Sequence, residues 1–239
     1  MSQEAARAPA VVTGASSGIG RALALALGKR GWSLLLAARD ADRLEAVRRA
    51  VEELGGTARA RALDVTDDAA VDAWVAGYAD RPEGVAALVH SAGMVHLGSV
   101  AETDVAMLDA HYAVNLRAPY RLTRALLPAL ERARGQVVFI NSGAGLHANA
   151  SWSAYAASKF GLRALADSLR QEVASRGVRV TTVYPGRTAT PMQAHVHEQE
   201  GRGYDPAAFV RPEDVGEQVA GLLSVAPPSV VTELVIRPG

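Results

Sequence analysis

Residues 13–20 read TGASSGIG, directly after a short apolar run and at the start of a helical pattern. Gly14, Gly18 and Gly20 carry no side chains, so the backbone can turn sharply there and approach a ligand closely. The first amide groups of the following helix, together with its dipole, favour a bound phosphate. Because this turn joins the first strand and the first helix of a βαβ pattern, it favours a pyrophosphate site over a purely structural turn. A Walker-type phosphate loop is disfavoured, since no Gly-Lys-Ser or Gly-Lys-Thr follows.

From this turn onward, short apolar runs alternate with longer amphipathic segments. Continuous apolar strands flanked by helices are typical of a parallel sheet that is buried on both faces. Right-handed crossovers then give a doubly wound, Rossmann-type α/β fold of about seven strands with helices on both faces. The expected strands are 9–13, 33–38, 57–63, 85–90, 135–141, 178–184 and 230–236, and the expected helices lie near 18–30, 41–54, 67–80, 103–131, 152–175 and 212–225.

No repeat, low-complexity tract or linker interrupts this alternation, so we predict a single domain over residues 1–239. Residues 1–8 are expected to form a flexible N-terminus. Residues 187–211 form the one long irregular segment, and loops of that length usually serve as functional lids. We therefore expect a substrate lid there.

The composition excludes several classes of protein. Apolar residues make up 49% of the 239, and Lys plus Arg equals Asp plus Glu at 25 each, so the formal net charge is zero. This balance indicates neither nucleic acid nor a membrane surface as partner, and no apolar stretch is long enough to span a bilayer or resembles a signal peptide. The chain has no cysteine, which excludes disulfides, thiolate metal sites and a cysteine nucleophile. We expect a soluble, cytoplasmic protein.

The second predicted strand ends in AARD (37–40), where dinucleotide folds choose between cofactors. An acidic residue here usually holds the ribose 2′-hydroxyl of NAD, whereas a nearby arginine accommodates the 2′-phosphate of NADP. Arg39 can hold phosphate oxygens through paired charge-assisted hydrogen bonds. Asp40 is the rival ribose ligand, but it stands where a helix begins and suits a helix cap. The sequence therefore favours NADP(H) over NAD(H).

Residues 153–161 read SAYAASKFG, which places Tyr155 four positions before Lys159. On a helix these two side chains lie one above the other on the same face. The spacing alone is also that of an ordinary amphipathic helix with an aromatic core residue and a solvated lysine. Together with a dinucleotide site, however, it indicates a phenol whose acidity is tuned by an ammonium group.

Four motifs in this order resemble the short-chain dehydrogenase/reductase family, and the resemblance covers essentially the whole chain. They are the glycine-rich turn TGASSGIG, Asn115 in HYAVNLRAP, Ser142 in FINSGAG thirteen positions before the tyrosine, and the pair Tyr155 and Lys159. The resemblance implies that these four residues, Asn115, Ser142, Tyr155 and Lys159, are catalytic.

The implied mechanism is hydride transfer by a nicotinamide, with the protein supplying orientation and proton transfer. Tyr155 would act as general acid or base, its pKa lowered by Lys159 and by an oxidised, cationic nicotinamide. Ser142 would stabilise charge on the substrate oxygen. Lys159 would also hold the nicotinamide ribose, and Asn115 would anchor a water that connects Lys159 to solvent; alternatively, Asn115 only bends its helix.

The same resemblance implies a set of cofactor contacts along the chain. Asp64 and the backbone of Val65 would contact adenine, although Asp64 could equally cap the helix that follows it. Ser91 stands where the family usually has asparagine, and Thr188 where it usually has an aliphatic residue, so hydrogen bonds at these two positions must differ or use the backbone. The expected cofactor-binding residues are Gly14, Ser16, Gly18, Ile19, Gly20, Arg39, Asp64, Val65, Ser91, Gly93, Tyr155, Lys159, Pro185, Gly186, Thr188 and Thr190.

The remaining candidates are histidines that could bind a metal and side chains that could contact the substrate. His195 and His197 form a His-x-His pair without a third ligand at a suitable spacing, so we predict no metal site. His90 is expected at the edge of the core. For two other residues, His147 and Trp152, a role in the pocket and simple packing stay equally open. The expected substrate contacts are Met94, Val95, Leu146, Met192 and the lid.

We conclude from the sequence that the chain is an NADP(H)-dependent oxidoreductase that interconverts a secondary alcohol and a ketone or aldehyde. Two alternatives stay open: a dinucleotide-binding sensor without turnover, and an NAD-linked dehydrogenase of a hydroxylated compound. The expected partner is a small-molecule alcohol or carbonyl substrate. The resemblance implies a homodimer or homotetramer, formed through the long helices near 103–131 and 152–175 and through the C-terminal segment.

Overall fold

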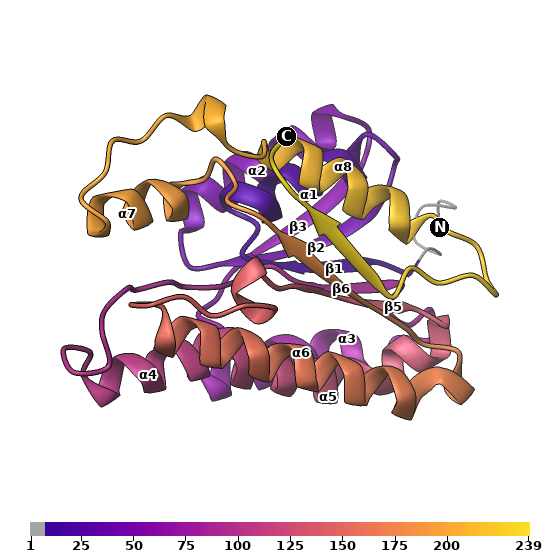
Figure 1. The fold of residues 1–239 in the computed structure, drawn as a ribbon. Helices are drawn as coiled ribbons and strands as arrows, with labels where there is room; N and C mark the ends of the chain where they lie inside the picture. The colour runs from indigo at the N-terminus through magenta and orange to yellow at the C-terminus, as the bar shows by residue number, and fades with distance from the viewer. Residues whose placement is uncertain (1–7) are drawn as a thin grey trace.

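A computed structural model describes residues 8–239 of the chain, which build one seven-stranded parallel sheet (Figure 1). The strand order is β3-β2-β1-β4-β5-β6-β7, so the chain starts in the middle of the sheet and reverses direction between β1 and β4. Such a reversal leaves a crevice at the carboxyl ends of the strands, where open α/β sheets bind ligands. The strands are β1 Ala10–Thr13, β2 Ser33–Ala38, β3 Thr57–Ala62, β4 Ala87–His90, β5 Gln136–Ile140, β6 Arg179–Pro185 and β7 Glu233–Ile236.

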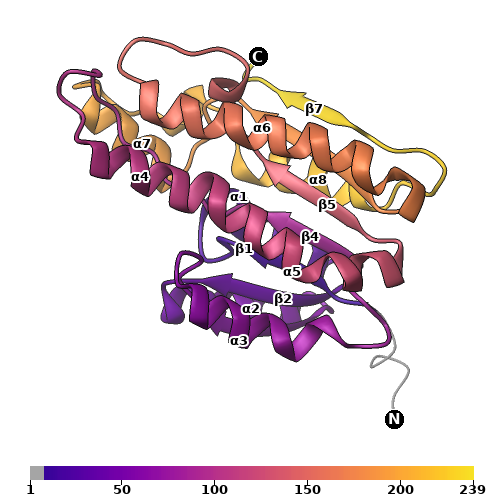
Figure 2. The ribbon, with the colours of Figure 1, turned by 90° about the horizontal axis from the view of Figure 1, so that it is seen from below.

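Helices cover both faces of the sheet, which confirms the predicted doubly wound fold (Figures 1 and 2). One face carries α1 Gly18–Gly28, α2 Ala41–Glu53 and α8 Pro212–Leu223. The other face carries α3 Asp68–Ala79, α4 Val105–Tyr112, α5 Ala118–Ala133 and α6 Ser153–Val173. A further helix, α7 Pro191–Gln199, lies apart from both layers, beyond one end of the sheet (Figure 1).

The period-two alternation of the strands divides the core into two layers. In β1, Val12 packs in the layer that includes Leu23 of α1 and Val219 of α8. Its neighbour Val11 packs in the opposite layer, with Leu122 of α5. Because successive strand side chains point to opposite faces, both faces of a central strand must be apolar. That requirement explains why these strands appear as continuous apolar runs in the sequence.

Two boundary predictions are corrected by the structure, and a third falls almost wholly outside the described residues. The C-terminal strand, expected over 230–236, begins only at Glu233. The single helix expected over 103–131 is interrupted by a π-helical turn, Ala113–Arg117. Of the N-terminal residues 1–8 expected to be flexible, only Ala8 belongs to the described part of the chain.

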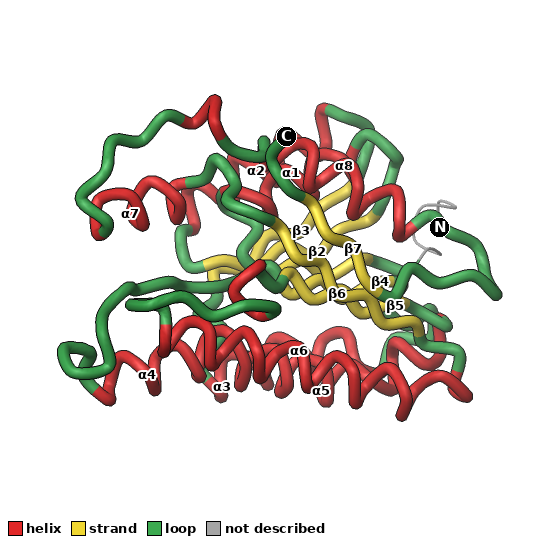
Figure 3. Tube along the Cα trace, in the orientation of Figure 1, coloured by secondary structure: helices red, strands yellow, loops and turns green. Residues whose placement is uncertain are grey.

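Residues 187–211, predicted to form an irregular lid, contain helix α7 (Figure 3). A β-bridge joins the two ends of this segment. Thr190 caps α7 by accepting a hydrogen bond from the Gln193 amide at 3.2 Å, and Pro191 occupies the first helical turn. This Thr-Pro start is a helix signal that the sequence prediction overlooked. Thr188 forms a parallel β-bridge with Val210, so the two ends of the segment lie side by side.

His90 lies in the core at the carboxyl end of β4 rather than at its edge. Its ring stacks on Phe139 at a centroid distance of 5.0 Å, and Nε2 lies 2.8 Å from Thr123 Oγ1. Complete burial lowers the pKa of His90 from 6.5 to about 3. The folded protein therefore keeps this imidazole neutral at a pH where the unfolded chain protonates it.

We expect this histidine to destabilise the fold in acid. As the pH falls below the unfolded pKa of 6.5, the unfolded chain binds a proton at His90. The folded chain does not bind this proton until the pH approaches its own pKa of about 3. Stability should therefore fall by about 2 kcal/mol between about pH 7 and pH 5 through this one group. Urea unfolding at both pH values measures it: His90→Asn should lose about 2 kcal/mol less than the wild type. Equal losses in the two proteins would contradict the assignment.

Candidate active site

A cleft with a cavity volume of about 1030 Å³ runs along the carboxyl ends of the strands. It is lined at one end by Arg39 and Asp64 and at the other by Trp152 and Arg187, with the glycine-rich turn between β1 and α1 along its wall. This is the crevice that the strand order creates. Most of the predicted site residues line it: Gly14, Ser16, Gly18, Ile19, Arg39, Asp64, Val65, Ser91, Gly93, Ser142, Tyr155, Lys159, Pro185, Gly186, Thr188 and Thr190.

Three predicted residues, Gly20, Asn115 and Leu146, lie outside the lining. Gly20 and Asn115 nevertheless contact residues that line it, as described below. Of the expected substrate contacts, Met94, Val95 and Met192 line the cleft, as do His147 and Trp152.

The glycine-rich turn has no room for side chains. Gly14 has a φ of +67°, and a Cβ atom there would lie 2.7 Å from the Ala92 Cα. A Cβ atom at Gly20 would lie 2.3 Å from the Gly14 carbonyl oxygen and 3.1 Å from Ser91 Oγ. The turn is thus packed against the segment after β4, with the Ser91 side chain beside Gly20. Gly18 and Ile19, the first residues of α1, line the cleft, and the free amides of a first helical turn suit a bound pyrophosphate.

At the Arg39 end of the cleft, Asp40 has a structural role. Asp40 caps α2 by accepting a hydrogen bond from the Arg43 amide at 3.0 Å, which confirms the helix-cap interpretation. Arg43, which the sequence analysis missed, lines the cleft next to Arg39. Two arginines therefore line this end of the cleft, and Arg43 also pairs with Asp40 at 3.2 Å.

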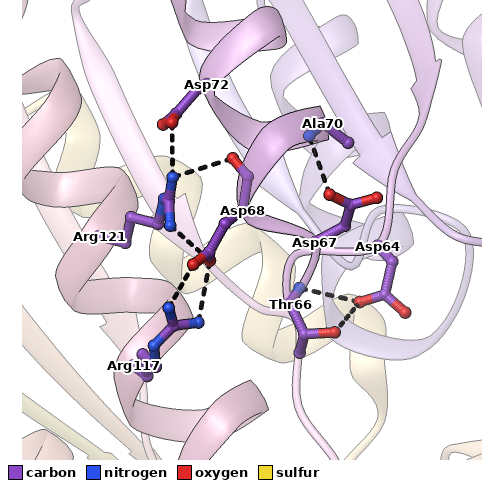
Figure 4. Close-up of polar contacts among 8 residues, drawn as sticks. All are labelled: Asp64, Thr66, Asp67, Asp68, Ala70, Asp72, Arg117 and Arg121. Atoms are coloured by element: carbon purple, nitrogen blue, oxygen red, sulfur yellow. Dashed lines mark hydrogen bonds and ion pairs between the residues drawn. The ribbon is translucent and has the colours of Figure 1, made fainter.

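Figure 4 shows that Asp67, and not Asp64, caps α3 by accepting from the Ala70 amide at 3.0 Å. The Asp64 carboxylate instead accepts from the amide and hydroxyl of Thr66, at 2.9 and 2.7 Å. These bonds hold the pKa of Asp64 below its usual value. The alternative that Asp64 caps this helix is therefore wrong, and its carboxylate is held at the cleft as an anion.

Ion pairs fasten the neighbouring helices to each other (Figure 4). Arg117, in the π-helical turn, pairs with Asp68 at the start of α3. Arg121 of α5 pairs with both Asp68 and Asp72. Exposed pairs of this kind contribute little stability singly, but a network between two helices fixes their relative position.

Tyr155 and Lys159 lie on α6 with both side chains buried. Lys159 Nζ lies 5.8 Å from the Tyr155 ring centroid and donates a hydrogen bond to the Ile140 carbonyl at 3.1 Å. Ser142 lies two residues after the end of β5 and caps a short turn, accepting from the Ala144 amide at 3.1 Å. Strand β5 and helix α6 thus bring the serine, the tyrosine and the lysine into one end of the cleft.

The π-helical turn directs Asn115 into the protein. Its Oδ1 accepts from the Met94 amide at 2.9 Å, while Nδ2 donates to the Met94 carbonyl and to Ser158 Oγ, both at 3.0 Å. A Cβ atom at Gly93 would lie 3.4 Å from Asn115 Oδ1 and 3.9 Å from Lys159 Nζ. Single π-turns inside helices often mark functional sites. Here the turn packs the asparagine amide and the lysine behind Gly93, and the helix departs from regular geometry there.

Burial shifts the pKa of both residues on α6. It raises the pKa of the Tyr155 phenol, and the Ser142 hydroxyl opposes that rise. It lowers the pKa of the Lys159 ammonium to about 8. Desolvation thus outweighs the hydrogen bond from Ser142, and the lowering of the Tyr155 pKa by Lys159 together with an oxidised, cationic nicotinamide stays a prediction.

Two rings pack edge-on against Tyr155 and orient it. Trp152 lies at a centroid distance of 5.7 Å with an interplanar angle of 64°, and His111 at 6.1 Å with 70°. His111 is fully buried: Nε2 accepts from the His96 amide at 3.0 Å, and Nδ1 lies 2.7 Å from the Met107 carbonyl. The sequence does not predict that His111 lies beside Tyr155, because this contact arises only from the packing of α4 against α6.

The segment 187–211, predicted to be a lid, contacts this end of the cleft through Arg187. Arg187 pairs through both terminal nitrogens with Glu200, and its guanidinium lies 5.9 Å from the Trp152 ring centroid. His197 lies buried beside it, with Nε2 3.1 Å from Arg187 Nη1, whereas His195 is exposed. Within residues 8–239, no cluster of three or more His, Cys, Asp or Glu side chains has a metal-binding arrangement. No helix of that same stretch has the length and hydropathy to cross a membrane.

The fold and the cleft together define a doubly wound α/β protein in which a serine, a tyrosine and a lysine face a dinucleotide-type glycine turn. Residues 8–201 match the short chain dehydrogenase family. The chain is 34% identical over 234 residues to the glycine betaine reductase ATRR of Emericella nidulans, covering 96% of this chain and 18% of that longer protein.

Solved structures give the same result over the full length. A variant of actinorhodin polyketide ketoreductase with NADPH is 31% identical with a TM-score of 0.89, covering 100% of this chain and 98% of that one. An alcohol dehydrogenase of the archaeon Thermococcus sibiricus, complexed with 5-hydroxy-NADP, is 28% identical with a TM-score of 0.87 and 97% coverage of both chains. The chain belongs to the short-chain dehydrogenase/reductase family and is an oxidoreductase of that family.

Proposed function

We propose that the protein is an NADP(H)-dependent oxidoreductase that interconverts a secondary alcohol and a ketone or aldehyde. The observation that carries this proposal is that Ser142, Tyr155 and Lys159 line the same cleft as the glycine-rich turn. That turn suits a dinucleotide, since a Cβ atom at Gly14 or Gly20 would collide with backbone. When bound, the nicotinamide supplies or accepts the hydride.

The side chains of the protein then move the proton. In reduction, the Ser142 hydroxyl donates a hydrogen bond to the substrate carbonyl oxygen, and the Tyr155 hydroxyl transfers its proton to that oxygen. In oxidation, the phenolate of Tyr155 accepts the proton of the alcohol. Lys159, whose pKa is lowered to about 8 by burial, is charged at neutral pH and stabilises that phenolate. Its ammonium would also hold the nicotinamide ribose, and Asn115 would hold a water that links this ammonium to solvent.

The pKa of Tyr155 decides which protonation state of the phenol is available for each direction of the reaction. Burial raises this pKa, so the phenol alone is protonated at neutral pH and suited to act as the acid in reduction. Formation of the phenolate for oxidation needs additional positive charge, which Lys159 and an oxidised nicotinamide supply.

The preference for NADP(H) rests on the two arginines at the adenosine end. Arg39 and Arg43 line the cleft, and the carboxylate of Asp40 is engaged as the cap of α2. A phosphate dianion would gain charge-assisted hydrogen bonds there, whereas a 2′-hydroxyl would not need two guanidinium groups. The two solved relatives described above contain NADPH and an NADP derivative, respectively, which supports the same preference.

The direct test is the loss of NADPH absorbance in the presence of ketones, aldehydes and β-keto esters. Turnover of one or more of these compounds is the expected result. Tight NADPH binding with no turnover across the panel would instead favour a dinucleotide-binding sensor. Turnover with NADH and none with NADPH would identify an NAD-linked dehydrogenase.

We also propose that the protein forms homodimers or homotetramers through α5 and α6. The outer faces of these helices expose large apolar side chains, Tyr120 at 55% and Phe160 at 41%. Replacing both by glutamate should reduce the mass in solution, measured by light scattering, to that of a single chain, because burying two unpaired carboxylates opposes association. Glutamate at the exposed Val100 of the loop before α4 serves as the control and should leave the mass unchanged. A wild type with the mass of one chain would contradict the proposal.

A further inference from the structure

Arg237 stands at the serine end of the cleft, immediately after strand β7. Its backbone is held in place: the Gly186 amide donates to the Ile236 carbonyl at 2.7 Å, and Pro185 is in register with Ile236. The side chain reaches back toward the active site. A Cβ atom at Gly143 would lie 3.2 Å from Arg237 Nη1, so the guanidinium of this exposed arginine lies against Gly143, the residue that follows Ser142.

The charge distribution along the cleft is uneven. Both carboxylates of the lining, Asp40 and Asp64, belong to the Arg39 end. The lining of the Ser142 end contains no acidic side chain but includes Arg187, Arg237 and His147.

Of the two arginines at this end, one is already neutralised. Arg187 is paired through both terminal nitrogens with Glu200. Arg237 makes no ion pair within residues 8–239. The serine end of the cleft therefore carries an uncompensated positive charge next to the residue that would bind the reacting oxygen.

We propose that Arg237 is a specificity-determining residue that binds an anionic group of the substrate, so that the substrate is a carbonyl compound bearing a carboxylate or a phosphate a few bonds from the reacting carbon. This inference rests on the proposed function. A guanidinium offers paired donors that match two oxygens of such a group, and Arg237 lines the same cleft as Ser142, against the residue that follows it. The ion pair would hold the carbonyl in register with both hydroxyls.

The test compares pairs of ketones that differ only in charge: acetoacetate with its methyl ester, 4-oxopentanoate with its methyl ester, and hydroxyacetone phosphate with hydroxyacetone. We expect the wild type to favour one of the anions by about tenfold or more in kcat/KM, mainly through KM, as for a hydrogen bond to a charged group. The carboxylate and phosphate pairs show which anion is preferred. Arg237→Met should remove most of this preference, and Arg237→Lys should restore part of it. Arg59→Met, which removes an exposed arginine from β3 at the opposite edge of the sheet, should leave the preference at its wild-type value.

The outcomes separate the two proposals. Turnover of neutral ketones with no preference for either anion would overturn this inference and leave the proposed function intact. An equal effect of Arg237→Met on both members of each pair would also overturn it. If no ketone were turned over, calorimetric binding of acetoacetate and of hydroxyacetone phosphate to the NADP-loaded protein would still decide: binding that Arg237→Met weakens about tenfold supports the subsite, and no binding to the wild type overturns it.

Discussion

Replacing Tyr155 by phenylalanine should lower kcat by about a thousandfold or more, within the range that a positioned general acid contributes. The substitution removes one hydroxyl and keeps the ring, so the edge-on contacts with Trp152 and His111 are retained. Phenylalanine also suits this buried site, where the phenol already carries a desolvation cost that raises its pKa. We therefore expect a folded variant that binds NADPH as the wild type does but cannot protonate the substrate oxygen. Steady-state kinetics with the best ketone of the panel, together with NADPH fluorescence titration, measures both properties.

The chain offers a matched control in Tyr184, a second fully buried tyrosine. It lies on β6 outside the cleft, with its hydroxyl 3.4 Å from Glu233, and burial raises its pKa to about 12. Tyr184→Phe removes the same atom from a similar environment, so its kcat should stay close to that of the wild type. If Tyr155→Phe kept wild-type turnover, or if both variants lost it equally, the acid–base role of Tyr155 would be refuted.

The sheet could be predicted from the sequence because each central strand is buried on both faces and must be apolar throughout. Strand β5, QVVFI, is buried at every position, and the run is recognisable without any tertiary information. The glycine-rich turn could be predicted for a similar reason. A side chain at position 20 would collide with the Gly14 carbonyl, which is only six positions away, so the need for glycine there follows from the local sequence.

Contacts between distant segments could not be predicted in this way. The pKa of Tyr155 depends on how completely α6 is covered, and no spacing between Tyr155 and Lys159 reports that burial. The proximity of Arg237 to Gly143 arises because β7 and β5 both border β6, a fact of strand order rather than of sequence pattern. The π-helical turn at Asn115 likewise follows from its bonds to Met94 and Ser158 on other segments.

Cofactor choice should respond strongly to Arg39, because the structure leaves no competing carboxylate free at that position. Asp40 accepts the amide hydrogen bond that starts α2 and also pairs with Arg43 at 3.2 Å. Asp64 is engaged by Thr66, and the Arg39 charge contributes to lowering its pKa. A 2′-phosphate bound at this end therefore meets guanidinium groups, while the neighbouring acids are held by the protein.

Arg39→Asp should lower the ratio of kcat/KM for NADPH to that for NADH by about a hundredfold or more, since it removes a charge-assisted hydrogen bond and places a like charge beside the phosphate. The loss should appear mainly in KM for NADPH, because the 2′-phosphate does not take part in the chemistry. Arg49→Asp makes the same change of charge on an exposed position of α2 that does not line the cleft, and it should leave the ratio within about threefold of the wild type. Steady-state kinetics with both cofactors measures the ratio. An equal rise of KM for NADPH and NADH in Arg39→Asp would show that this arginine does not bind the 2′-phosphate. The proposal of NADP(H) as the cofactor would then lose its main support.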